Sequence, residues 1–105
     1  MTGSVAVANL KTMRRHAGAA AAMLRALSHE ARLLVLCELT AGECTAGELV
    51  GRSGLSQSAL SQHLAKLRGE GLVETRREAQ SIFYRIADPR AARLLGVLHE
   101  IYCKR

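Results

Sequence analysis

Two short helices that each begin with a capping residue, separated by a glycine-containing turn, constrain this sequence more than any other feature. Thr45 and Glu48 have the spacing of a capping box, in which the hydroxyl and the carboxylate satisfy backbone N–H groups of a first helical turn. The helix that follows ends at the tight turn Ser53-Gly54-Leu55, after which Ser56 can cap a second helix. This order of signals predicts a helix-turn-helix over residues 45–70.

The pattern of apolar residues changes from helical to alternating after Gly71. Residues 72–77 and 81–86 predict two strands, and Glu78-Ala79-Gln80 predicts the turn between them. The sequence therefore predicts a β-hairpin, or wing, over residues 72–86.

Helices are also predicted on both sides of this unit. A run rich in Ala and Leu predicts a helix over residues 10–27, and Ser28 can cap a second, strongly apolar helix. Asp88 can cap a last helix over residues 89–103, whereas residues 1–9 show no pattern and are expected to be flexible.

Length and composition indicate one small domain that spans all 105 residues. Only 3% of the residues are aromatic, and the apolar bulk is mostly Leu and Ala, which favours helix. The predicted fold class is mainly α with a small β-hairpin wing: a winged helix-turn-helix of four helices, two strands and a last helix. Its modest core makes a dimer plausible.

The sequence gives no sign of export or membrane insertion. No apolar run approaches the roughly 20 residues of a membrane span. The first ten residues lack the pattern of a secretion signal. A cytoplasmic protein with no membrane partner is therefore expected.

Charge points toward nucleic acid. The net charge is +6, and residues 51–105 carry ten Lys or Arg against five acids, whereas residues 1–50 carry five against four. A basic surface attracts phosphates and releases their counterions. Charge alone leaves open that this is only a solvated basic face.

The helix predicted from Gln57 to about Gly69 has one apolar and one small, polar side. At 100° per residue its leucines share a face, while serine, glutamine and alanine lie opposite. Such a face fits the major groove, where Gln can pair with adenine. The predicted DNA contacts from this helix are Gln57, Ser58, Ser61, Gln62, His63 and Lys66, and those from the hairpin are Arg76, Arg77, Gln80 and Arg85. Simple solvation, and helix packing for His63, remain the alternatives.

Three segments together resemble the ArsR/SmtB family of bacterial repressors: LSHEARL from Leu27, Gly47-Glu48-Leu49, and LSQSALSQHLAKLRGEGLVETRREAQSIFYRIAD from Leu55. The resemblance implies a homodimer in which residues 10–27 and 89–103 form the interface. It also implies two recognition helices on a palindromic double-stranded operator, and an inducer that weakens DNA binding.

The three cysteines, Cys37, Cys44 and Cys103, bear on the inducer. None lies in a CxxC pair, which argues against a structural zinc site. Metal-sensing branches of the family carry a thiol pair near Cys44, but this chain has Cys44 alone. The second metal site of these branches lies on the last helix. There Asp88 matches the first ligand, whereas Arg90 stands where a histidine ligand is expected. No metal or other cofactor is predicted, although a metal- or arsenite-responsive repressor that uses Cys44 with another thiol or His99 remains an alternative.

Cys37 and Cys103 resemble the paired thiols of the persulfide- and redox-sensing branch of this family, the BigR, YgaV and SqrR type. The resemblance implies that one thiol attacks a reactive sulfur species or oxidant and that the other resolves the product. The predicted function is a repressor that releases its operator when this pair reacts. A small core residue is the alternative for Cys37.

No catalytic constellation is present in the sequence. There is no Ser/His/Asp pattern, Gly-rich phosphate loop or pair of carboxylates in a suitable arrangement, so an enzyme is not predicted. A third class of function remains open, namely an architectural protein that binds DNA without sequence preference.

Overall fold

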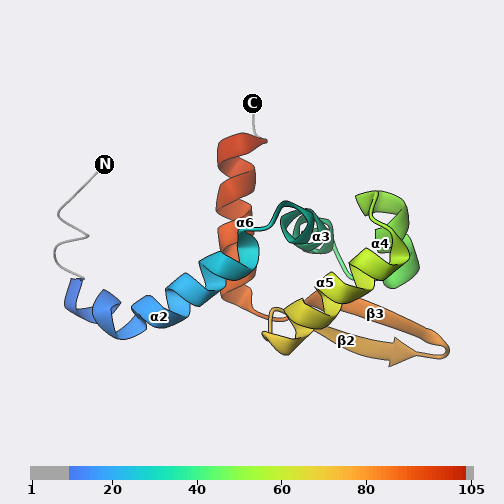
Figure 1. Ribbon diagram of the computed structural model, residues 1–105, viewed down its shortest axis with the longest axis horizontal. Helices are drawn as coiled ribbons and strands as arrows, with labels where there is room; N and C mark the ends of the chain where they lie inside the picture. Colours follow the sequence, from blue (N-terminus) through green and yellow to red (C-terminus); the bar gives the residue numbers. More distant parts are fainter. Residues whose placement is uncertain (1–9, 104–105) are drawn as a thin grey trace.

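A computed structural model describes residues 10–103, and residues 1–9, for which flexibility was predicted, lie outside the described range. The fold is mainly helical with a small antiparallel sheet, which confirms the predicted class. The elements, in chain order, are α2 (Leu10–Leu27), α3 (Glu30–Thr40), β1 (Cys44–Thr45), α4 (Ala46–Ser53), α5 (Gln57–Gly69), β2 (Val73–Glu78), β3 (Ser81–Ile86) and α6 (Pro89–Tyr102) (Figure 1).

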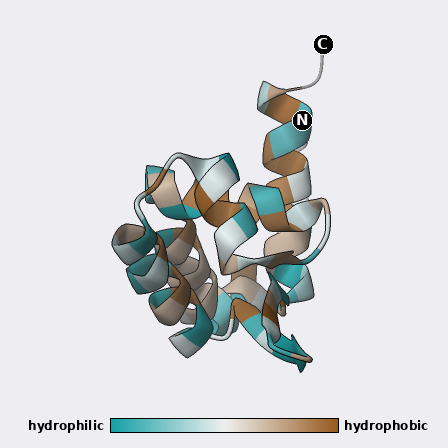
Figure 2. Cartoon of the chain, turned by 90° about the vertical axis from the view of Figure 1, so that its right-hand side faces the viewer, coloured by the Kyte–Doolittle hydropathy of each residue, from teal (hydrophilic) through white to brown (hydrophobic). Residues whose placement is uncertain are grey.

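The elements form a compact body from which two helices project. In Figure 1, α3, α4 and α5 lie together with the β2–β3 hairpin extending beside them, while α2 and α6 leave this body in different directions. Figure 2 shows α6 rising clear of the body with apolar segments along it. No helix in the described part of the chain is long and apolar enough to cross a bilayer.

The core is built almost entirely from aliphatic side chains. Leu60, Leu64 and Leu67 of α5 are at most 2% exposed, which confirms the predicted inner face of this helix. Every element except β3 contributes fully buried or nearly buried side chains, the largest being Leu36, Leu49, Leu60, Leu67, Leu95, Val35, Val73 and Cys44. Within residues 10–103 no polar or charged residue is buried, so apolar burial holds the body together.

The predicted caps of the helix-turn-helix are present. The backbone N–H of Glu48 donates to Thr45 Oγ1 at 3.2 Å, and the N–H of Thr45 donates to Glu48 Oε1 at 2.8 Å. Ser56 Oγ accepts from the N–H of Ala59 at 3.1 Å. Between the helices Gly54 has φ +76°, a left-handed conformation that glycine adopts without steric cost. Local chemistry therefore fixes the angle at which α5 leaves α4.

The predicted cap of α3 is wrong by one residue. The side chain of His29 takes this position, and its Nδ1 accepts from the backbone N–H of Ala31 at 3.2 Å. The Ser28 hydroxyl instead donates to the carbonyl of Arg25 at 2.9 Å, at the end of α2. Serine satisfies either helix end, and here the preceding helix uses it.

The sheet has one strand more than the sequence predicted. Cys44 pairs with Tyr84 and Thr45 pairs with Phe83, which places β1 beside β3 in the order β1-β3-β2. Two residues are too few to show an alternating pattern. The hairpin itself lies where it was predicted, and its turn includes Ala79 at φ +56°.

The cap of α3 leads to a test of stability. We expect His29→Ala to lower the free energy of unfolding by about 1 kcal/mol, because the N–H of Ala31 loses its acceptor. His29→Asn, which supplies an equivalent acceptor, should restore most of this loss. Urea titration monitored by circular dichroism measures both. A larger cost for Ser28→Ala than for His29→Ala would contradict the assignment.

Candidate nucleic-acid interface and thiol pair

The outer face of α5 is open to solvent. Ser58, Ser61 and Gln62 are exposed, as are Ala65 and Lys66, while the leucines on the opposite side are buried. Gln57 is also exposed in the first turn. Small side chains allow this face to approach base edges closely, and a glutamine at its centre can donate to and accept from one base. The arrangement is that of a recognition helix.

His63 sits at the edge of this face and packs against the start of α3. Its ring centroid lies 4.8 Å from that of His29, with the rings tilted by 55°. Partial burial lowers the pKa of His63, and the charges of His29 and Arg32 lower it further. The ring contact is the packing role that the sequence left open, and a DNA contact by His63 stays a prediction.

The wing arginines differ in how they are held. The Arg76 guanidinium donates to Glu43 at 2.8 Å through Nε and to Glu78 at 2.7 Å through Nη1, and it lies 4.6 Å from the centroid of the Phe83 ring. These carboxylates raise the pKa of Arg76 above its usual range. Its partner Glu43 lies in the loop that follows α3, so the ion pair joins this loop to the wing.

Arg85 and Arg77 are the other two arginines predicted to contact DNA from the wing. Arg85 Nε donates to Glu74 across the hairpin at 2.6 Å. Arg77 is exposed and has no ion pair among residues 10–103, and Gln80 is exposed at the tip. Of the predicted wing contacts, Arg77 thus carries the charge that is most available to a phosphate. The sequence missed the role of Glu43, which lies 33 residues from Arg76 and gives no local signal.

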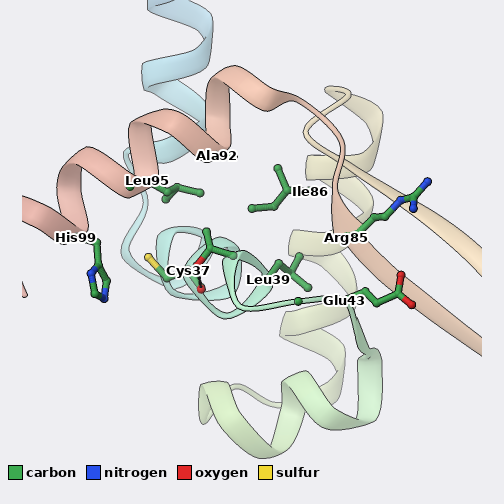
Figure 3. A pocket seen from close by; sticks show the side chains of 11 residues that line it. Cys37, Leu39, Glu43, Arg85, Ile86, Ala92, Leu95 and His99 are labelled. Atoms are coloured by element: carbon green, nitrogen blue, oxygen red, sulfur yellow. Dashed lines mark hydrogen bonds between the residues drawn. The ribbon is translucent and has the colours of Figure 1, made fainter.

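Cys37 lies on α3 beside a cavity of about 520 Å³ between α3, β3 and α6. Figure 3 shows its sulfur on the side of α3 that faces α6, with His99 reaching in from α6. Other lining residues include Thr40, Glu43 and Arg85, so the cavity extends from the thiol toward the wing. A small reagent that enters the cavity would reach a half-buried thiol.

Cys103 lies at the end of α6, the helix that packs against the α3 of Cys37. Burial raises the pKa of the Cys37 thiol, and the nearby Cys103 and Glu38 raise it further. Cys103 is exposed at the C-terminal end of α6, where its N–H donates to the carbonyl of His99 at 2.9 Å. Both thiols are free in this structure. The two cysteines, distant in sequence, thus lie on helices that pack against each other.

Cys44 has a different environment. It is 2% exposed on β1, and Arg52 Nη1 donates to its sulfur at 3.2 Å. Burial raises the pKa of this thiol, while Arg52 opposes the rise. No cluster of three or more His, Cys, Asp or Glu side chains suited to a metal ion occurs within residues 10–103. His99, the other candidate ligand, lines the cavity beside Cys37, whereas Cys44 does not line that cavity.

The fold and the outer face of α5 define a class: a winged helix-turn-helix regulator that binds DNA. A family model described as "Bacterial regulatory protein, arsR family" matches residues 29–75. The chain is 46% identical to the transcriptional activator HlyU of Vibrio cholerae, over 91% of this chain and 89% of that protein. It is also 46% identical to the biofilm growth-associated repressor of Agrobacterium fabrum, over 90% and 80%.

Solved structures agree with these similarities. The crystal structure of the transcriptional repressor BigR from Xylella fastidiosa matches with a TM-score of 0.84 at 42% identity, covering 90% of this chain and 97% of that one. Reduced HlyU from Vibrio cholerae matches with a TM-score of 0.83 at 45% identity, covering 90% and 99%. The chain belongs to the ArsR family of bacterial transcription regulators and, like these relatives, is not an enzyme.

A contrast between two residues tests the orientation of the reading surface. We expect Gln62→Ala to reduce discrimination between operator and random duplex by about 1–3 kcal/mol. Arg77→Ala should weaken binding to both duplexes equally and lower the magnitude of the salt slope by about one for each bound protomer. Fluorescence anisotropy at several salt concentrations measures both effects. A uniform loss from Gln62→Ala would show that this residue does not read bases.

His63 predicts a dependence of stability on pH. Because its pKa is lower in the folded chain than the value of 6.5 expected when unfolded, the unfolded chain binds more protons in this range. The free energy of unfolding should therefore be highest above about pH 6.5 and fall as the pH drops through the folded pKa. Urea titrations from pH 8 to pH 5 measure this slope. His63→Gln should reduce this dependence of stability on pH. His16→Gln, which changes an exposed histidine on α2, is the control and should leave the dependence unchanged. Equal slopes in the unmodified protein and both variants would contradict the prediction.

Proposed function

We propose that this protein is a dimeric, cytoplasmic repressor that releases a palindromic operator when Cys37 and Cys103 react with a persulfide or another thiol oxidant. The observation that carries the proposal is the half-buried Cys37 thiol beside a cavity between α3 and α6, with Cys103 at the C-terminal end of α6 and among the groups that raise the pKa of Cys37. The names of the relatives support repression and activation of transcription, and the thiol pair supplies a means of control.

The chemistry needs both thiols. The Cys37 thiolate attacks the terminal sulfur of a persulfide R–S–SH, which forms the protein persulfide Cys37–S–SH and releases the thiol R–SH. The Cys103 thiolate then attacks the Cys37 sulfur, forms the disulfide and releases hydrogen sulfide. With a different oxidant, the two thiols together give up two electrons and two protons to form the same bond. A longer polysulfide bridge would retain additional sulfur atoms between the two residues.

A bond between α3 and α6 would reach the DNA-binding surface through short connections. The Thr40 hydroxyl donates to the carbonyl of Cys37 at 2.6 Å, and the loop after Thr40 leads to Glu43, which holds Arg76 in the wing. On its other side α3 packs Leu36 into the same core as the α5 leucines. Movement of α3 toward α6 would therefore act on both the wing and the recognition helix.

A second copy of the chain fits the projecting helices. Leu10, Met13 and Leu24 of α2 are exposed, as are Val97, Ile101 and Tyr102 of α6. A hollow of about 450 Å³ between these helices is lined mainly by apolar side chains, Met13, Met23 and Leu94 among them. Exposed apolar surface of this kind marks an interface, and a homodimeric winged helix-turn-helix domain from Mycobacterium bovis matches this chain at a TM-score of 0.70. A dimer would place the end of α6, with Cys103, beside the interface.

The cysteine variants test this proposal. We expect Cys37→Ser and Cys103→Ser to bind operator DNA with the affinity of the unmodified protein but to lose release by glutathione persulfide. Cys44→Ser is the matched control and should still respond, because Cys44 is buried beside Arg52. Anisotropy before and after treatment gives the response, and mass spectrometry distinguishes a disulfide, a polysulfide bridge and no reaction. A full response from Cys37→Ser would overturn the proposal.

The same assay separates the alternatives. Loss of response in Cys44→Ser, together with stoichiometric binding of zinc or arsenite by the reduced protein, would indicate a metal- or arsenite-responsive repressor. Equal competition by operator and random duplex at fixed salt would indicate an architectural protein without sequence preference.

A further inference from the structure

A basic hollow lies at the junction of α2, α3 and α5, outside the predicted DNA contacts other than Lys66. Its volume is about 440 Å³, and its lining includes the side chains of Arg25, Ser28, Arg32 and Lys66, together with one acid, Glu70. The three cations come from three different helices. No local sequence pattern brings them together, so only the fold shows the cluster.

The positive charge of this hollow is largely uncompensated. Arg25 and Arg32 have no ion pair with any residue in the range 10–103. Glu70 lies 3.8 Å from Lys66, and both side chains are well exposed, so this pair is weak. The field of Arg32 extends to the recognition helix, where it contributes to the lowered pKa of His63. A site with three cations and one acid favours an anion.

The hollow adjoins the surface that faces DNA. Lys66 lies one turn after Gln62 on α5, and residues four apart share a helix face. The contact between His29 and His63 holds the start of α3 against the same helix, and Arg32 follows one turn later on α3. Arg25 completes the hollow from the last turn of α2. The cations therefore continue the outer face of α5 toward the end of α2.

We propose that the hollow lined by Arg25, Arg32 and Lys66 binds a phosphate group of the DNA backbone next to the bases that α5 reads. Arginine forms two-pronged hydrogen bonds to phosphate oxygens, and the Ser28 hydroxyl on the rim offers a further donor. Phosphate contacts of this kind fix the position of a recognition helix but do not read sequence. The inference rests on the DNA-binding function and is independent of the thiol chemistry.

The site has a consequence for how α2 takes part in binding. Because Arg25 belongs to α2, part of the affinity for DNA depends on where the end of this helix lies relative to α5. α2 is also one of the two helices proposed to pair with a second copy. The phosphate site would therefore link the dimer interface to the DNA directly.

The salt dependence of binding tests the proposal. Operator duplexes are first selected from a random pool with the unmodified protein, and affinity is then measured by anisotropy between about 50 and 200 mM KCl. Each lost phosphate contact should lower the magnitude of the slope of log K against log salt by about one. We expect this change once for each bound protomer, hence about two per dimer, for Arg25→Gln and for Arg32→Gln, with weaker binding to selected and random duplexes alike. Arg25→Lys, which keeps the charge, should stay close to the unmodified slope.

Arg14→Gln is the matched control. Arg14 is also exposed on α2. It lies eleven residues before Arg25, which puts it on nearly the same face of the helix but about 16 Å away along the axis. The proposal is overturned if Arg25→Gln leaves the slope unchanged, or if Arg14→Gln changes it by the same amount. Urea unfolding shows whether Arg32→Gln is folded, and Arg25→Gln decides the outcome if it is not. If the unmodified protein selects no duplex, the proposed operator recognition fails, and the slopes on random duplex still decide the phosphate site.

Discussion

The leucine stripe on the inner side of α5 determines how the rest of the molecule is oriented. Leu60, Leu64 and Leu67 can be buried together only if the opposite side of the helix faces solvent. Burial of three leucine side chains contributes on the order of several kcal/mol, far more than any surface contact of this helix. The DNA-reading face is thus a consequence of core packing. Serine, glutamine and alanine are tolerated there because that face is exposed and buries no apolar side chain.

The features that the sequence predicted correctly all depend on short-range chemistry. The capping box of Thr45, the cap at Ser56 and the alternation of residues 81–86 involve neighbours within a few positions. One error, the cap of α3, was local, because Ser28 bonds back to Arg25. The other misses arose where distant segments meet. β1 forms because Cys44 lies beside Tyr84, and Arg76 is held by a carboxylate that no local pattern connects to it.

The same distinction applies to the candidate sites. The face of α5 follows from helical periodicity, so its exposed residues could be predicted from the sequence. The pairing of Cys37 with Cys103 was suggested by resemblance, and it is the packing of α3 against α6 that places their two helices in contact. The hollow of Arg25, Arg32 and Lys66 had no signal at all, because its cations come from three helices. Single exposed arginines are indistinguishable in a sequence until the fold collects them.

The thiol cavity and the basic hollow both involve α3, so this helix would transmit the proposed response to the DNA contacts. Its first turn carries Arg32 and follows the His29 cap, which touches the recognition helix. Its last turns carry Cys37 and lead to the loop that holds the wing. α3 has eleven residues and a fully buried centre at Val35 and Leu36, so we expect it to shift as one unit. A thiol bond at one end would therefore displace the other end as well, so that DNA contacts at the wing, at α5 and beside α2 would change together.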